Sequence, residues 1–257
     1  MARPALDDAA WASRWRHRST LEKAVLSLGL LAVAVASPGW VMSLVILAVC
    51  VVIALVWARV PARGYLIALL APVSFVLIGA AAIAVHIGSA PDDAVWAWGP
   101  FSATADSLLR AATVSARSIA AFSAMLLLAA TTPVSDVLAG LRRIRVPEVL
   151  IDIAGLMYRM LFALLSASSA IREAQAARLG YSSGLTARRS FGMLGGAVLM
   201  QAWNRARRLE AGLAGRGYTG SLRTLAAPHP VSIPFIAASV LVVVALAAAS
   251  VLQVIVR

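Results

Sequence analysis

The hydrophobic positions of this chain gather in long runs, each about as long as a membrane helix. Spanning a bilayer takes about 20 mostly apolar residues. The runs cover Leu21–Ser37, Trp40–Val60, Tyr65–Ile87, Leu108–Ala130 and Ile233–Val256. We expect a helix from each, with a kink at Pro72 in the third, because proline lacks the backbone donor that a helix interior needs. The pattern predicts an all-α integral membrane protein with about five transmembrane helices.

Residues 131–230 interrupt this pattern, since they are too polar for a membrane span and too apolar for a disordered tail. They contain thirteen arginines against five acids. Three helices are predicted here, over Ser135–Arg145, from Pro147 to about Leu179, and from about Ala187 to Arg216. The last two helices would each be about 45 Å long at 1.5 Å per residue. They can therefore pack as a long cytoplasmic hairpin.

The chain thus divides into N-terminal membrane helices (1–130), a cytoplasmic region of long helices (131–230) and a C-terminal membrane helix (231–257). One alternative stays open within the cytoplasmic region. Residues 149–170 are apolar enough to form a sixth membrane helix. Asp152 and Arg159 speak against it, because ionised side chains inside lipid are costly.

Composition and charge support a membrane protein. Of the 257 residues, 61% are hydrophobic and 13% are charged, and the net charge is +12. Soluble domains have about 45–50% apolar and about 25% charged residues. A basic protein can also be a nucleic-acid binder. Here the arginines lie between apolar runs, as in cytoplasmic loops, so we expect the lipid bilayer and no nucleic acid as partner.

The placement of the basic residues predicts the orientation. Basic side chains cluster around the start of the first span and around the link from the second span to the third: Arg14, Arg16, Arg18, Lys23, Arg59 and Arg63. The loop after the third span has Asp92 and Asp93 and no basic residue, and its Trp96 and Trp98 suit a membrane interface. We expect a multi-pass protein of a bacterial or archaeal cytoplasmic membrane, with the N-terminus in the cytoplasm.

Two stretches end the long predicted helices in a similar way: "EAQAARLGY" at 173–181 and "EAGLAGRGY" at 210–218. Both place small residues before an arginine, which glycine and tyrosine follow. Small residues allow close approach, and an arginine pairs bidentately with a carboxylate. Gly180 and Gly217 are the expected helix stops. The simpler interpretation is a pair of ordinary caps, since the helix dipole favours arginine at a C-terminus.

These ends resemble the cobalt/nickel branch of the transmembrane T components of energy-coupling-factor (ECF) transporters, the CbiQ-like proteins. Two further stretches share the likeness, "DDAAWASRWRHRSTLEKAVLSLGLL" and "TTPVSDVLAGLRRIRVPEVLIDIAGLMYRMLFALL". In that family the two motifs end coupling helices that dock into grooves on two ATP-binding-cassette (ABC) ATPase subunits. The membrane helices hold a separate substrate-binding S component.

The resemblance implies two docking motifs in this chain, Ala176-Ala177-Arg178 and Ala214-Gly215-Arg216. The second motif of the family usually reads Ala-Arg-Gly, so Gly215 is a departure, and glycine should make this helix end less rigid. The chain would then be a non-catalytic scaffold and coupling subunit for uptake of Co²⁺ or Ni²⁺. It would bind no cofactor itself, with ATP and Mg²⁺ held by the partner ATPases.

The remaining residues fit this picture. His17, His86 and His229 lie far apart, without the spacing of metal ligands, and the chain has no Walker phosphate-binding loop.

Two other functions stay open. In a stand-alone permease, Arg110 and Arg117 of the fourth span would line an anion path. More simply, Arg110 would reach the outer interface, while Arg117 pairs with Asp106 or a backbone carbonyl. A membrane-embedded transferase of lipid substrates would need clustered carboxylates for a divalent metal, and the sequence lacks the required aspartates.

Overall fold

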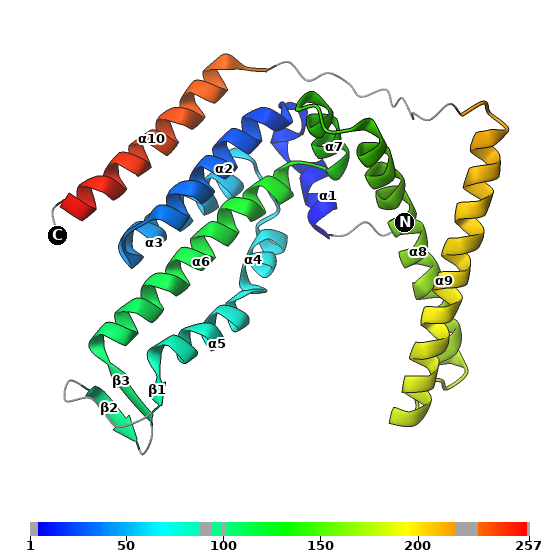
Figure 1. The fold of residues 1–257 in the computed structure, drawn as a ribbon, viewed down its shortest axis with the longest axis horizontal. Helices are drawn as coiled ribbons and strands as arrows, with labels where there is room; N and C mark the ends of the chain where they lie inside the picture. The colour runs from blue at the N-terminus through cyan, green and yellow to red at the C-terminus, as the bar shows by residue number, and fades with distance from the viewer. Residues whose placement is uncertain (1–4, 88–93, 99–100, 219–230, 256–257) are drawn as a thin grey trace. The chain divides into compact units, whose positions relative to one another are not determined.

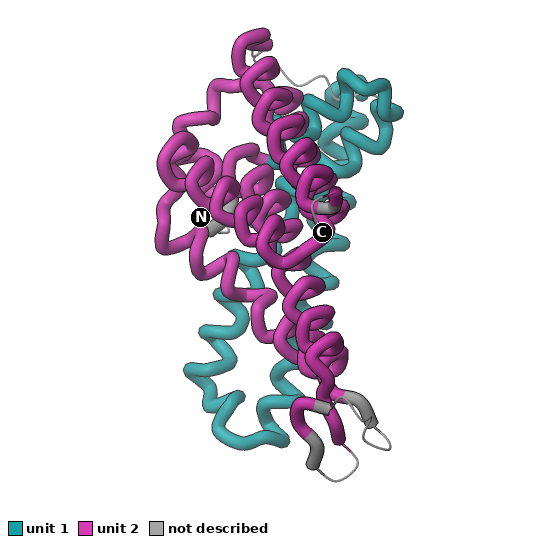
Figure 2. Tube along the Cα trace, turned by 90° about the vertical axis from the view of Figure 1, so that its left-hand side faces the viewer, with its two compact units in different colours: residues 1–4, 134–227 teal, residues 5–133, 228–257 magenta. Residues whose placement is uncertain are grey.

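The computed structural model describes residues 5–87, 94–98, 101–218 and 231–255. The chain divides into two compact units (Figure 2). The bundle unit comprises residues 5–133 and 228–257, and the hairpin unit comprises residues 1–4 and 134–227.

Helices build the bundle unit (Figure 1). They are α1 (Ala5–Ala12), the 3-10 helix η1 (Arg14–His17), α2 (Thr20–Ala36), α3 (Trp40–Val52), the π-helical turn η2 (Ile53–Trp57), α4 (Ala62–Leu70), α5 (Val73–Ala84), α6 (Ala105–Thr131) and α10 (Ile233–Ile255). The long helix α6 packs against α2, α3, α4 and α5, and α10 packs against α2. Helix α6 is therefore the centre of this unit.

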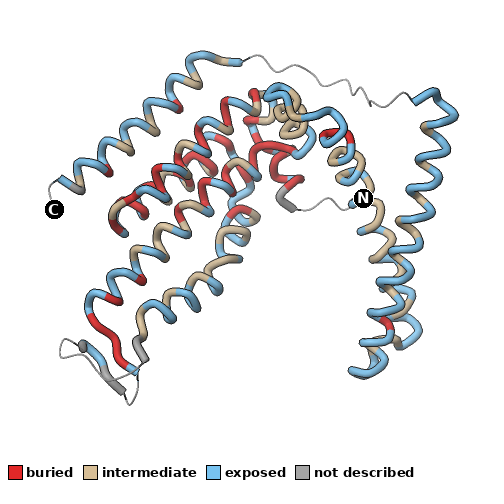
Figure 3. The backbone as a smooth tube through the Cα atoms, viewed as in Figure 1, coloured by how far each residue is buried: buried red, intermediate tan, exposed pale blue. Residues whose placement is uncertain are grey.

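The core of the bundle unit lies where α2, α3 and α6 face one another (Figure 3). Leu30, Ile46, Ala124 and Leu127 are fully buried there. Large apolar side chains also cover the outside, and Phe75 on α5 is 79% exposed. Soluble proteins rarely expose large continuous apolar patches. An apolar outer face around an apolar core suits a protein surrounded by lipid.

Four of the predicted spans are confirmed as helices long and apolar enough to cross a membrane. They cover Trp40–Trp57, Ala62–Ala84, Ala105–Thr131 and Ile233–Gln253. The break at Pro72 is also confirmed, because α4 ends at Leu70 and α5 begins at Val73. The first predicted span forms α2, which has only 17 residues and is shorter than a typical span.

The fifth helix that meets the length and apolarity of a span is Glu148–Ala177 in the hairpin unit. Its Asp152 is 8% exposed and lies 3.3 Å from Arg142 as an ion pair. Pairing reduces the cost of placing this carboxylate in an apolar setting. The ion pair thus answers the objection that Asp152 raised against a membrane location for residues 149–170.

A small antiparallel sheet lies between the end of α5 and the start of α6. This sheet was not predicted from the sequence. Its strands are β1 (His86–Ile87), β2 (Ala94–Trp98) and β3 (Phe101–Thr104), in the order β1-β3-β2. Phe101 faces Ile87 on one side and Trp98 on the other. Asp92 and Asp93 lie outside the described residues. The sheet is a minor addition to a helical membrane protein.

The hairpin unit consists of α7 (Val134–Arg143), α8 (Glu148–Ala177) and α9 (Gly184–Ala214). Helix α9 begins three residues earlier than predicted, because Ser183 caps its start with a capping box. Its hydroxyl accepts the Thr186 N–H at 3.3 Å, and the Thr186 hydroxyl accepts the Ser183 N–H at 3.0 Å. This reciprocal pair satisfies two N–H groups at the helix start.

Two matched helix ends as a candidate docking site

The end of α8 closes with two backbone hydrogen bonds. The Gly180 N–H donates to the Gln175 carbonyl at 2.8 Å, and the Leu179 N–H donates to the Ala176 carbonyl at 3.0 Å. Leu179 has a φ of 59°. A left-handed residue with this pair of bonds defines the Schellman motif, which satisfies carbonyls that the last helical turn leaves free. Arg178 stands directly before the left-handed residue.

The end of α9 repeats the same arrangement. The Tyr218 N–H donates to the Leu213 carbonyl and the Gly217 N–H donates to the Ala214 carbonyl, both at 3.1 Å. Gly217 has a φ of 70°. Arg216 again stands directly before the left-handed residue. The likeness read from the two sequence stretches thus extends to the backbone, which presents each arginine from the same kind of helix end.

The residue in the left-handed position differs between the ends. Gly217 adopts this conformation without a steric penalty, as expected of a helix stop. At the first end the expected stop was Gly180, but the left-handed residue is Leu179. A non-glycine residue held there costs about 1–3 kcal/mol. Leu179 is also 73% exposed, so burial of its side chain within the chain does not offset this strain.

Gly180 is needed for close packing instead. A Cβ atom at this position would lie 2.6 Å from the Ser190 hydroxyl oxygen and 2.9 Å from the Gln175 carbonyl oxygen. Ser190 lies on α9. Glycine therefore lets the chain after α8 pass tightly against the neighbouring helix, which sequence spacing alone does not reveal.

Three side chains hold the first end against α9. The Gln175 side-chain amide donates to the Ser190 carbonyl at 3.0 Å, and the Ser190 hydroxyl donates to the Gly180 carbonyl at 2.8 Å. The Tyr181 hydroxyl donates to the Gln175 side-chain oxygen at 2.7 Å. Ser190 is only 3% exposed. We call Gln175, Tyr181 and Ser190 the clamp; sequence reasoning missed it because its members come from both arms of the hairpin.

The second end has no such support. From Leu209 to Tyr218, all of which the structure describes, no side chain makes a hydrogen bond or an ion pair with another described residue. A Cβ atom at Gly217 would meet nothing within 4 Å. The end of α9 therefore projects as a single helix tip.

The proposed docking residues are all on the surface: Ala176, Ala177, Arg178, Ala214, Gly215 and Arg216 are exposed. Within the described ranges, neither guanidinium group has a hydrogen-bonding or ion-pair partner. Their planar donor groups are thus available for a carboxylate outside this chain. The two ends also carry exposed larger side chains next to the arginines, Leu179 at the first and Tyr218 at the second.

The two arginines of α6 are engaged within the bundle unit. Arg110 forms an ion pair with Asp106 at 2.8 Å, and both side chains are largely exposed. Arg117 donates to the Ser37 carbonyl at 2.6 Å, one of the two partners expected for it in the simpler interpretation. This hydrogen bond ties α6 to the end of α2, so it gives Arg117 a structural role and offers no support for an anion path.

Comparison with known proteins identifies relatives that match nearly the whole chain. The model of the family CbiQ, described as cobalt transport protein, matches residues 12–227. A cobalt transport protein CbiQ of Rhodobacter capsulatus is 37% identical over 237 residues, 92% of this chain and 93% of the relative. The CbiQ of Salmonella typhimurium is 30% identical over 224 residues, 84% of this chain and 97% of the relative.

A longer relative joins two components in one polypeptide. The putative fused cobalt transport protein CbiMQ of Methanocorpusculum labreanum is 31% identical over 221 residues, 84% of this chain but 37% of the relative. The matched part thus accounts for a minority of the fused protein. Both helix ends described above lie within the range of the family match.

Proposed function

This chain belongs to the CbiQ family of cobalt transport proteins, and from that premise we propose that it is the coupling subunit of an ECF-type importer of Co²⁺ or Ni²⁺. It would link ATP hydrolysis by two ABC-type ATPase subunits to metal uptake through a separate S component. The chain itself would have no catalytic role. ATP and Mg²⁺ would bind to the ATPases.

The observation that carries this proposal is the pair of matched helix ends. Two neighbouring helices finish with the same hydrogen-bond pattern, and each presents an exposed arginine directly before a left-handed residue. Two equivalent tips suit a partner that comes as two equivalent subunits. Arginine next to small residues favours a groove that contains a carboxylate.

The chain also provides a continuous route from the end of α8 to the membrane helices. Helix α8 is an unbroken helix of 30 residues, so it can move as a rigid rod about 45 Å long. Only Thr132 and Pro133 separate the end of α6 from the start of α7. A force on the hairpin unit would therefore reach α6, around which the bundle unit packs.

The end of α6 is anchored within the bundle unit. The fully buried Lys23 donates from its ammonium group to the Thr131 carbonyl at 2.9 Å. This bond joins the last residue of α6 to the first turn of α2. A displacement that reaches α6 would thus be shared with α2 instead of being absorbed by a frayed helix end.

The transported metal would bind elsewhere in the complex. Within the described ranges, no three histidine, cysteine or acidic side chains lie close enough together to hold a metal ion. The fused relative supports a second transport component, since most of its length lies outside the part that matches this chain. An S component of the cobalt/nickel type is the partner that this arrangement favours.

Co-expression with the ATPase subunits tests the proposal. Arg178→Ala and Arg216→Ala should each reduce co-purification of the ATPases or uncouple ATP hydrolysis from metal uptake. Removing one partner of a desolvated charge pair costs about 2–5 kcal/mol, so the loss should exceed tenfold. Arg143→Ala is the matched control, since Arg143 is an exposed arginine in the last turn of α7 and belongs to neither docking motif. Normal ATPase binding and uptake in both tip variants would contradict the proposal.

A further inference from the structure

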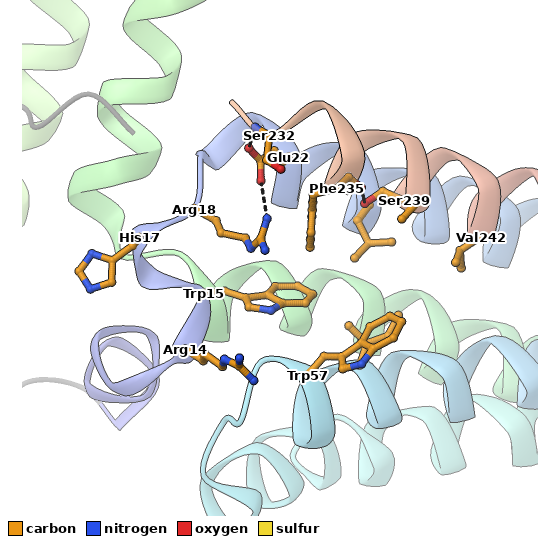
Figure 4. A pocket seen from close by; sticks show the side chains of 13 residues that line it. Arg14, Trp15, His17, Arg18, Glu22, Trp57, Ser232, Phe235, Ser239 and Val242 are labelled. Carbon is orange, nitrogen blue, oxygen red and sulfur yellow. Dashed lines mark hydrogen bonds and ion pairs between the residues drawn. The ribbon is translucent and has the colours of Figure 1, made fainter. Parts of the chain in front are cut away.

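A cavity of about 590 Å³ opens in the bundle unit where α2 and α10 begin and η2 ends (Figure 4). It lies at the end of the unit that carries the N-terminal segment, which the arginines predict to face the cytoplasm. The docking proposal makes no use of this cavity. Its size falls within the usual range of ligand sites, about 300–1,000 Å³.

Apolar and aromatic side chains line most of the cavity. They are Trp15, Leu26, Ile53, Trp57, Phe235, Ala238 and Val242. The Trp15 and Phe235 rings meet edge to face with centroids 5.2 Å apart. Tryptophan favours the interface between lipid headgroups and acyl chains. Such a lining suits a hydrocarbon chain that enters from the interface.

Two arginines of the N-terminal segment lie at the mouth. Figure 4 shows Arg14 and Arg18 on either side of Trp15. Arg14 is exposed, and no other described residue bonds to its guanidinium group. The Arg18 guanidinium lies 4.5 Å from the centroid of the Phe235 ring, and its side chain is 41% exposed. Both arginines therefore have donors free for an anion.

The one acid among the lining residues is already matched internally. Glu22 is fully buried and lies 3.6 Å from Arg18 as an ion pair. It also accepts a hydrogen bond from the Ser232 backbone N–H at the start of α10. The charge of Glu22 is thus balanced by Arg18, and the charge of Arg14 is left uncompensated. The cavity combines a cationic group with a mostly apolar lining.

We propose that this cavity binds one anionic phospholipid, with its phosphate on Arg14 and Arg18 and part of an acyl chain against Trp15 and Phe235. Arginine pairs with phosphate through two parallel hydrogen bonds. Basic pockets between membrane helices on the cytoplasmic side are suited to phospholipid headgroups. Residues 219–230 precede α10 but contain Arg223 and no acid, so they do not complement the cationic mouth. This inference is independent of ATPase docking.

Native mass spectrometry of the full chain in detergent, titrated with phosphatidylglycerol or phosphatidylcholine, tests the site. We expect the anionic lipid to be retained about fivefold more strongly, and Arg14→Gln to remove that preference, as one arginine near a lipid surface contributes a factor of this size. Arg63→Gln is the matched control, because Arg63 is an exposed arginine on α4 outside the cavity. It should leave the preference unchanged.

A second variant tests the apolar part without changing any charge. Ala238→Phe would add a ring to the cavity lining and narrow the space for an acyl chain. Retention of phosphatidylglycerol should therefore fall while thermal melting shows a folded protein. Equal retention of the two lipids by the wild-type chain would overturn the proposal. So would equal losses in the Arg14 and Arg63 variants, which would indicate only a general surface charge, or full competition by inorganic phosphate, which would exclude the acyl chain. If the Ala238 variant does not fold, the comparison of Arg14→Gln with Arg63→Gln decides.

Discussion

The ends of α8 and α9 have the same backbone, but their surroundings differ. The first end is held to the neighbouring helix by the clamp of Gln175, Tyr181 and Ser190. The second end has no side-chain hydrogen bond within its described residues. Fixing a binding element in advance lowers the ordering cost of association. We therefore expect the first end to dock as a preformed anchor and the second to become ordered on its partner.

The left-handed position sharpens this difference. Gly217 suits the conformation, whereas Leu179 holds it at a steric cost and leaves its side chain exposed. A strained backbone at an exposed residue suggests that the residue contacts a partner outside the chain. A partner would therefore meet a leucine next to the arginine of the first tip, and a glycine followed by a tyrosine next to the arginine of the second.

Replacing Gly180 and Gly217 should reveal the largest difference between the two helix ends. Gly180→Ala would push a methyl group against Ser190 and the Gln175 carbonyl, at a cost of about 1–3 kcal/mol for overpacking. Because this contact joins α8 to α9, hydrogen exchange should accelerate along both helices near the turn.

Gly217→Ala is the comparison for that variant. Its methyl group meets no neighbour within 4 Å, so the cost is only that of the left-handed backbone, about 1–2 kcal/mol. Its effect should stay within the last turn of α9. An equal spread of faster exchange in the two variants would refute the distinction between an anchored and an unsupported end.

Removing the clamp hydroxyl should have an intermediate effect. Ser190→Ala removes the side-chain donor of the partly buried Gly180 carbonyl, and a lost hydrogen bond of this kind costs about 0.5–1.5 kcal/mol. Hydrogen exchange at the Gly180 amide should become faster, while the Tyr218 amide should not change. Ser166→Ala serves as control, since among the described residues the Ser166 hydroxyl bonds only to the Phe162 carbonyl within α8. If both serine variants behave alike, the clamp does not fix the first end.

Replacing the left-handed Leu179 should have the smallest effect on stability. Unlike the other variants, it should stabilise the protein. Leu179→Gly removes the backbone strain but adds freedom to the unfolded chain, so the free energy of unfolding should rise by no more than about 1 kcal/mol. ATPase association should nevertheless weaken if Leu179 contacts the partner. Thermal melting and a binding titration on the same variant separate the two effects. Unchanged affinity would remove Leu179 from the docking surface.

The helices could be predicted from the sequence because their signals are local. Apolar runs gave most of the spans, and Pro72 gave the break between α4 and α5. The small sheet was missed because β1 and β3 are two and four residues long, too short for an alternating pattern to stand out. The paired strands β1 and β3 are also separated in the sequence by more than ten residues.

The candidate site was predictable only in part, for a similar reason. The repeated arginine pattern identifies two helix ends without any knowledge of the fold. The clamp depends on how α8 and α9 pack, because Ser190 reaches Gly180 only in the folded hairpin. The left-handed leucine was missed because glycine is the expected residue there, and Gly180 lies one position further along. The cavity likewise joins residues from η1, α2, η2 and α10.

The central claim is that both helix ends bind ATPase subunits, and cysteine labelling tests it most directly. The native Cys50 is buried, so an introduced cysteine can be labelled selectively with maleimide. Ala176→Cys and Ala214→Cys place a thiol at each tip, and Ala206→Cys places one on the exposed surface of α9 away from the tips. In the assembled complex, labelling at both tips should slow at least tenfold while labelling at position 206 stays unchanged. Equally fast labelling at both tips in a complex that demonstrably forms would contradict the account.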